Sequence, residues 1–424
     1  MEIICHRSSR VNPLCFCDSC HIFITGEQQM NSCVVAREAV TPAKPAWRAV
    51  YSLGLGVFGL ITAEFLPASL LTPMAASLGV SEGMAGQAVT ATALVALVTG
   101  LLITPATKNI DRRWVLMFFS VLQIISSLLV AFAPTLHVLL MGRLLLGVAI
   151  GGFWAMSTAT AMRLVPADKV PKALAVIFSS VSIATVVAAP LGSYLGSLIG
   201  WRNVFILCIL PSMLALLWQL WVLPSMKPES SGSLSTLFRV LRRPGMIGGM
   251  LATILIFSGH FAFFTYLRPF LETVGQASVE SISLILLGFG IANFIGTTVA
   301  GHLLARNLRL TLALVPFAMG VLALTMVAFG HLAMLDGLLV ALWGFAFGLV
   351  PVGWSTWLAT TVPDEAESAG GLLVASIQLA ISAGAAVGGA VFDLNGASGV
   401  FAGSGFLLVT AMVIVFMGVK VKAE

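Results

Sequence analysis

Two side chains of opposite charge lie inside long apolar stretches of this sequence. Glu64 stands in the run ITAEFLPASLL, and Arg143 stands in the run MGRLLLGVAIGGFW. An ionisable group at membrane depth costs at least about 2.5 kcal/mol, so it is a functional hypothesis by default. A carboxylate beside a guanidinium in a cavity of low dielectric can bind or release a proton as water access changes. The pair therefore predicts proton coupling, with Glu64 as the proton-binding group and Arg143 as its partner.

Two other interpretations of this pair stay open. Glu64 and Arg143 could form a permanently satisfied structural pair, or Glu64 could bind a substrate without ever taking up a proton. A measurement of transport driven by a proton gradient distinguishes proton coupling from these two interpretations. Only proton coupling requires the Glu64 carboxyl group to titrate.

Polar and aromatic residues in other apolar stretches could contact a planar substrate. Aromatic rings can stack on a base, and amide groups can hydrogen-bond to its edge or to a ribose. Most aromatic residues in a membrane bundle pack against neighbours or face lipid, so a packing role stays open for each. Arg268 could equally anchor the chain at the outer interface. The candidates are Trp154, His260, Phe264, Tyr266, Asn293, Trp354 and Gln378, together with Phe261 and Arg268.

The composition shows what kind of scaffold must hold these groups. Of the 424 residues only 9% are charged and 58% are hydrophobic, with a mean hydropathy of +1.02. Soluble domains carry about 25% charged residues, so an ordinary soluble enzyme is excluded, and so is a disordered chain. A membrane-spanning helix needs roughly 20 apolar residues. The sequence contains twelve such stretches, at about 50–74, 85–106, 114–133, 136–160, 173–199, 203–223, 246–270, 281–304, 310–330, 334–360, 368–392 and 400–420.

The stretches divide into two sets of six around a polar linker with Pro224 and Pro244 at its ends. We therefore predict an N-terminal tail over 1–46, a six-helix bundle over 47–223, a linker over 224–244 and a second bundle over 245–424. An internal repeat supports this division, because Gly147, Gly151, Pro166 and Gly192 map at a constant offset of 197 onto Gly344, Gly348, Pro363 and Gly389. Parallel six-span repeats are typical of major facilitator transporters.

The same offset places Val340 where the first half has Arg143. No acidic residue lies deep in spans seven to twelve, so proton handling is expected to belong to the first half.

The basic residues predict the orientation. With both termini in the cytoplasm, every Lys and Arg except Arg143, Arg202 and Arg268 falls on the inner side. This is the positive-inside pattern. The net charge of +5 is therefore interpreted as a topology signal and not as a nucleic-acid surface.

The first residues differ from the rest of the chain. Cys15, Cys17, Cys20 and His21 form one cluster, whereas zinc sites usually pair two such clusters at a distance. We predict no metal site here. Residues 1–29 are interpreted as an over-extended start ahead of Met30, or as a disordered tail. The sequence also lacks a G-K-[ST] phosphate-binding loop, so no cofactor is predicted and the proton gradient is the expected energy source.

Three motifs carry a family resemblance. Arg143, Gly147 and Gly151 resemble the span-four motif of major facilitator drug:proton antiporters, with the proton-linked arginine. Ala189-Pro190-Leu191-Gly192 resembles their Gly-Pro antiporter motif, with Ala189 in place of the usual glycine. Asp111, Arg112 and Arg113 form a degraded version of the superfamily loop after span two. Lys108 and Thr104 replace its usual Asp and Gly, which puts in doubt the charge relay that this loop forms between the two halves.

Longer blocks resemble the bacterial purine ribonucleoside efflux pumps within this superfamily. They occur in both halves and read EFLPASLLTPMA, GGFWAMS, RLVPADKVPKALAVIF, GWRNVF, FAFFTYLRP and LVPVGWSTW. The resemblance implies export of purine ribonucleosides such as inosine and guanosine, and of related base analogues, in exchange for protons. We expect the protein to be a monomer in the inner membrane. Export of sugars or amphiphilic drugs by the same machinery is the alternative. A non-transporting membrane receptor or scaffold is an alternative of another class, and an enzyme is not expected.

Overall fold

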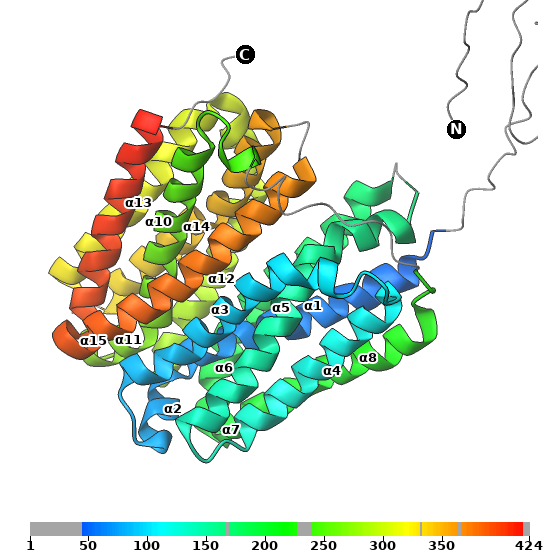
Figure 1. Cartoon of the computed structure of the whole chain (residues 1–424). Coiled ribbons are helices and arrows are strands. Elements are labelled where there is room, and N and C mark those ends of the chain that lie inside the picture. Colours follow the sequence, from blue (N-terminus) through cyan, green and yellow to red (C-terminus); the bar gives the residue numbers. More distant parts are fainter. Residues whose placement is uncertain (1–44, 167–168, 227–238, 331–332, 363–365, 419–424) are drawn as a thin grey trace, which may run out of the picture. The chain divides into compact units, whose positions relative to one another are not determined.

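The apolar stretches fold into long helices, because a backbone in lipid must satisfy its hydrogen bonds within the segment. The computed structural model describes residues 45–166, 169–226, 239–330, 333–362 and 366–418 (Figure 1). Every regular element in these ranges is helical. The protein is therefore an all-α membrane protein, as the sequence predicts.

The first half of the chain contains eight of the labelled helices. They are α1 (Trp47–Ser69), α2 (Leu71–Leu78), α3 (Glu82–Ala106), α4 (Arg112–Ala131), α5 (Leu136–Leu164), α6 (Val170–Ile199), α7 (Trp201–Leu207) and α8 (Ile209–Val222). The second half contains α10 (Met246–Thr265), α11 (Leu267–Thr273), α12 (Val279–Arg306), α13 (Leu308–Phe329), α14 (Ala333–Thr361) and α15 (Ala366–Gly418).

Eleven described helices are long and apolar enough to cross a membrane. The last of them, α15, has 53 residues and includes Gly396, whose φ of 68° and ψ of −173° are not helical. This kink lies in the gap predicted between spans eleven and twelve. The twelve-span count itself stays a prediction, as do the cytoplasmic termini.

Spans one and seven are interrupted, although the sequence predicts them as continuous over 50–74 and 246–270. The helix stops at Leu70 and at Tyr266, which have nearly the same backbone angles, with φ of −117° and −104° and ψ of 11° in both. Pro73 and Pro269 are each the third residue of the short helix that follows. A proline fits there because the first turn of a helix has no internal partner for its N–H groups.

The internal repeat is present in the packing. A Cβ added to Gly147 or Gly151 of α5 would lie 2.4 or 2.2 Å from a carbonyl oxygen of α3, at Thr92 or Ala96. Their repeat mates Gly344 and Gly348 of α14 meet the carbonyls of α12 in the same way, at 2.4 and 2.2 Å. Only glycine permits such close helix approach.

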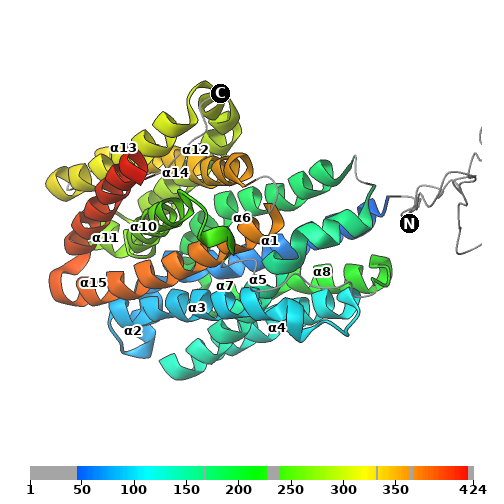
Figure 2. The same cartoon turned by 45° about the horizontal axis from the view of Figure 1, so that its top comes forward.

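The most extensive contacts between helices of the two halves are those of α3 with α15 and of α6 with α12 (Figures 1 and 2). Residues from Pro45 onward form one unit by their contacts. The boundaries of the two bundles and the linker therefore stay predictions. Residues 1–44 of the tail and 227–238 of the linker lie outside the described residues.

Candidate functional site

Arg143 lies at the meeting point of three helices of the first half. It is 1% exposed, and its guanidinium donates to the carbonyl oxygens of Ala63 (2.7 Å) and Glu64 (3.3 Å) on α1 and of Ala88 (3.1 Å) on α3. Pro67 explains why the carbonyl of Ala63 is available. A helix normally bonds that carbonyl to the N–H four residues later, and proline has none. Arg143 thus supplies the donor that the sequence of span one leaves out.

Glu64 and Arg143 are brought together, but by a different contact from the one the sequence suggests. The described hydrogen bond joins the Arg143 guanidinium to the backbone oxygen of Glu64, at 3.3 Å. The Glu64 side chain is half-buried. Three carbonyls therefore hold the positive charge of Arg143 against the backbone at Glu64, and these contacts do not depend on the charge state of the Glu64 carboxyl group.

An aromatic cluster in the second half lies next to this site. We define it as His260, Phe264, Phe289, Trp343 and Phe347. Trp343 Nε1 donates to Nδ1 of His260 at 3.0 Å, and the Phe347 ring stacks on the imidazole with centroids 3.3 Å apart. Phe264 also meets Phe65 of α1, with ring centroids 5.7 Å apart. The aromatic cluster therefore reaches the first half at the residue directly after Glu64.

Access to these rings differs. His260, Phe264, Phe289 and Trp343 are buried, whereas Phe65 and Phe347 are half-buried. The imidazole of His260 is nearly parallel to the rings of Phe347, Phe264 and Phe289, with ring centroids 3.3, 5.7 and 6.3 Å away. Phe65 and Phe347 therefore keep some exposed ring area, and the His260 imidazole packs against Phe347.

Gln378 is the candidate with an unused polar group. Its side chain is 5% exposed, and its amide nitrogen has no hydrogen-bond partner among the described residues. A buried donor without a partner is unfavourable by about 1–3 kcal/mol, so a substrate oxygen or nitrogen that accepts from it would be favoured.

The other substrate candidates already have neighbours. Asn293 donates to the Gly344 carbonyl (3.3 Å), and Trp154 stacks on Phe178 with centroids 5.6 Å apart. Tyr266 is fully buried, and its hydroxyl donates to the Ala385 carbonyl at 3.1 Å. Phe261 packs edge-on against His260 with ring centroids 5.0 Å apart. Their roles toward substrate stay predictions.

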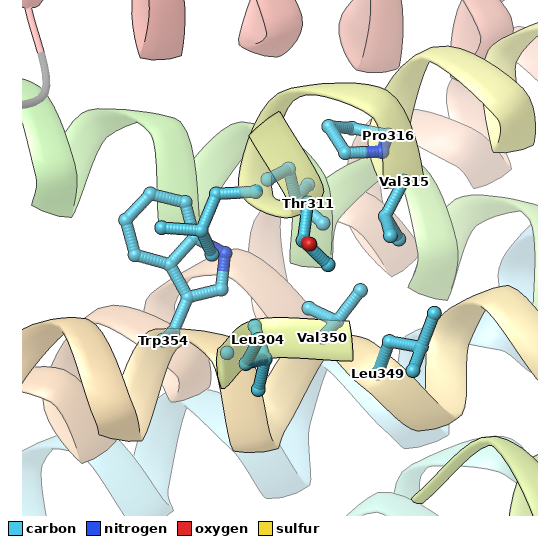
Figure 3. A pocket seen from close by; sticks show the side chains of 10 residues that line it. Leu304, Thr311, Val315, Pro316, Leu349, Val350 and Trp354 are labelled. Atoms are coloured by element: carbon cyan, nitrogen blue, oxygen red, sulfur yellow. The ribbon is translucent and has the colours of Figure 1, made fainter. Parts of the chain in front are cut away.

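Trp354 lines a separate, small pocket in the second half, and most of the residues around it are apolar. Figure 3 shows its indole beside Leu304 and Thr311, with Val350 and Leu349 on the same helix. The pocket lies among α10, α12, α13 and α14, and none of its lining residues belongs to the aromatic cluster.

The loop after span two ties helices of the first half together. Asp111 accepts hydrogen bonds from the Ser225 hydroxyl and from the backbone N–H groups of Met226 and Arg113, the latter two at 2.9 Å. Burial alone would raise the pKa of Asp111, but these hydrogen bonds and the Arg113 charge together lower it. Arg112 donates to Thr107 (2.6 Å) and Arg113 to the Leu220 carbonyl (2.7 Å). These contacts join the loop to helices of the first half and to the start of the linker, at Ser225 and Met226.

The antiporter motif lies on α6 beside the break in span one. Pro190 is inside α6, and a Cβ added to Gly192 would lie 2.7 Å from both Leu66 and Ser69. Its repeat mate Gly389 meets Tyr266 in the same way, at 2.6 Å. Both glycines therefore allow a helix to approach the interrupted span, α1 in one half and α10 in the other.

The described residues contain no group of three or more His, Cys, Asp or Glu side chains that could hold a metal ion. The cluster of Cys15, Cys17, Cys20 and His21 lies outside the part of the chain that the structure describes. The interpretation of residues 1–29 as an over-extended start therefore stays a prediction.

Sequence reasoning missed two features of the site. The carbonyl partners of Arg143 carry a readable signal, since Pro67 frees the carbonyl four residues before it. No sequence signal marks the aromatic residues at the site, because aromatic residues are common in apolar spans. Only the packing brings together Phe65, Phe289, Trp343 and Phe347.

Comparisons with known proteins agree with this architecture. Residues 53–385 match the Major Facilitator Superfamily. The chain is 48% identical over 373 residues to the "Purine ribonucleoside efflux pump NepI" of Salmonella paratyphi B, covering 88% of this chain and 94% of the relative. The protein of that name from Salmonella enteritidis PT4 is 49% identical over the same shares. A crystal structure of a D-xylose-proton symporter superposes with a TM-score of 0.70 at 19% identity, covering 88% of this chain and 98% of the symporter, which shows the fold.

These findings confirm the resemblance inferred from the motifs. The relatives are transporters and not enzymes, and the eleven apolar helices make this chain a multi-pass membrane protein. The chain belongs to the major facilitator superfamily, as a transporter homologous to purine ribonucleoside efflux pumps.

Proposed function

We propose that this protein exports purine ribonucleosides such as inosine and guanosine, and related base analogues, across the inner membrane in exchange for protons. Similarity to purine ribonucleoside efflux pumps over 88% of the chain carries this proposal. The proposal includes twelve spans with both termini in the cytoplasm, and a monomer as the working unit. Glu64 takes up the proton beside the fixed charge of Arg143, and the base stacks on Phe65 and Phe347.

The geometry supports a link between proton and substrate. Glu64 and Phe65 are consecutive residues of α1, and Phe65 contacts Phe264 of the aromatic cluster. A base that stacks at Phe65 would keep water away from the Glu64 carboxyl group, which belongs to the preceding residue. Loss of water disfavours the charged form of a carboxylate. Binding of proton and binding of substrate at this point therefore influence each other.

Everted membrane vesicles test the function directly. Their interior corresponds to the outside of the cell, so export appears as accumulation. We expect labelled inosine and guanosine to accumulate when respiration acidifies the interior, and a protonophore to abolish the accumulation. Accumulation that ignores the protonophore would contradict proton coupling. Accumulation of a sugar or an amphiphilic drug in place of inosine would support the alternative substrates, and transport of none of these would favour a receptor or scaffold.

Gln378→Leu is expected to weaken substrate binding. The amide nitrogen of Gln378 is a buried donor without a partner, and purines offer ring nitrogens and, in inosine and guanosine, a keto oxygen as acceptors. Loss of one such hydrogen bond corresponds to roughly tenfold in affinity. Competition between labelled and unlabelled inosine in the vesicles measures this change.

The thermal stability of the same variant is the control. If Gln378 is merely an unsatisfied polar group, Leu removes an unfavourable burial and should raise the melting temperature with the affinity unchanged. That result would remove Gln378 from the substrate site. Gln219→Leu provides the comparison, because Gln219 is equally buried but bonded to Ser120 at 2.8 Å, so its loss should act on stability.

A further inference from the structure

Arg268 is a buried cation of the second half that contacts the first half. It lies on α11, is 5% exposed, and its guanidinium donates to the Ser69 carbonyl on α1 and to the Ser193 hydroxyl on α6, the latter at 3.4 Å. Its Nε also forms an ion pair with Glu272 of its own helix, at 2.7 Å. We refer to Arg268, Ser69, Ser193 and Glu272 as the Arg268 latch.

The carbonyl of Ser69 is available for the same reason as that of Ala63. Ser69 is the last residue of α1, and the residue four positions later is Pro73, which has no N–H to donate. Span one therefore has two carbonyls that prolines leave free, and each receives an arginine. Arg143 comes from the same half, whereas Arg268 comes from the other half, so only the second contact breaks if the halves separate.

Glycines bring the two halves close beside the Arg268 latch. A Cβ added to Gly83 of α3 would lie 2.5 Å from the carboxyl group of Asp393, and one added to Gly86 would lie 2.1 Å from the Tyr266 hydroxyl. Ser81 also donates to Asp393 at 3.0 Å. These residues are at the start of α3 and beside the kink of α15, the same end of the spans as Ser69. We define this contact as the α3–α15 seam.

We propose that the Arg268 latch closes the outward end of the transport path and opens once in each transport cycle. The proposal uses the orientation predicted from the basic residues and rests on the proposed export. Opening exposes the Ser69 carbonyl to water, which replaces the lost hydrogen bond, and Glu272 stays with Arg268 because both are on α11. Neither group is left buried without a partner, so the contact can break reversibly.

Labelling of a buried reporter cysteine tests the latch. Ala85 of α3 is 1% exposed and packs in the core cluster of the second half, so a cysteine there is reached only when the α3–α15 seam opens. The full-length chain with its native cysteines replaced and Ala85→Cys added is treated from outside intact cells with a membrane-impermeant maleimide. We expect Arg268→Ala to raise the labelling rate roughly tenfold, as loss of a hydrogen bond to a charged group predicts.

Arg202→Ala is the matched control. Arg202 is a second outer arginine, and its hydrogen bonds to Ser77 (3.4 Å) and to the Ala133 carbonyl (3.0 Å) stay within the first half. Its loss should leave the labelling rate unchanged. An equal rate for Arg268→Ala and its parent would overturn the proposal, and so would labelling from the cytoplasmic side alone.

A second variant leaves the latch intact and covers a failure of Arg268→Ala to fold. Ser81→Cys with Asp393→Cys places two thiols across the α3–α15 seam. We expect their oxidation to a disulfide to stop transport and a reductant to restore it. Full transport by the oxidised pair would overturn the proposal. The maleimide assay contains no nucleoside and therefore does not depend on the proposed substrate. If Arg268→Ala speeds labelling but the vesicles accumulate no nucleoside, the proposed substrate is refuted and the proposal for the Arg268 latch is still supported.

Discussion

Glu64→Gln is expected to abolish accumulation of nucleoside driven by a proton gradient while the protein still folds. Gln has nearly the same shape as Glu but cannot take up a proton, so the substrate no longer exchanges for one. The fold should persist because Arg143 contacts the backbone oxygen of Glu64, and the substitution leaves that oxygen in place. Everted vesicles measure the energised accumulation, and the melting temperature in detergent measures the fold.

Exchange of labelled for unlabelled nucleoside separates the remaining interpretations, since it moves no net proton. Loss of gradient-driven accumulation with exchange retained supports proton coupling. If gradient-driven accumulation and nucleoside exchange weaken equally, Glu64 binds substrate without titrating. If the melting temperature falls, Glu64 and Arg143 form a structural pair. Glu280→Gln is the control, because Glu280 is an exposed carboxylate at the start of α12 and should leave every measurement unchanged.

The helices could be predicted because membrane spans leave the chain few choices. A run of apolar residues must form its hydrogen bonds internally, so its hydropathy predicts the helix. The breaks at Leu70 and Tyr266 were missed because a window of about 19 residues averages over a single residue. The prolines that follow each break, Pro73 and Pro269, were visible in the sequence and would have indicated both.

The candidate site was predictable only in part. Glu64 and Arg143 were found because charge is costly in an apolar span. The contact of Arg143 with backbone carbonyls was missed, although Pro67 in the sequence marks the Ala63 carbonyl as one without a helical partner. The repeat offset pairs Gly147 with Gly344, and in the structure a Cβ added to either glycine would lie 2.4 Å from a carbonyl oxygen of the neighbouring helix. The aromatic cluster depends on rings from α10, α12 and α14, which no spacing along the chain connects.

Arg143→Lys is expected to destabilise the protein and to stop transport, although it keeps the charge. An ammonium group is a point charge, whereas the planar guanidinium donates in several fixed directions. Lys can form a good hydrogen bond to only one of the carbonyls of Ala63, Glu64 and Ala88. Each buried carbonyl that loses its donor lowers the stability of the fold by about 1–3 kcal/mol. The melting temperature should fall, and vesicles should show no energised accumulation. Arg309→Lys, at an exposed arginine bonded to the Phe416 carbonyl at 2.7 Å, is the control and should change neither.

Pro67→Ala separates two roles of Arg143, which are its hydrogen bond to the Ala63 carbonyl and the charge that it places near Glu64. Alanine at position 67 supplies the N–H that α1 lacks, so the Ala63 carbonyl gains a helical partner. In combination with Arg143→Met, it should restore part of the lost stability but none of the transport, because the charge beside Glu64 stays absent. The two substitutions would then be non-additive, as expected for groups that share one partner. An equal effect of Pro67→Ala on stability with and without Arg143 would show that the proline and the arginine act independently.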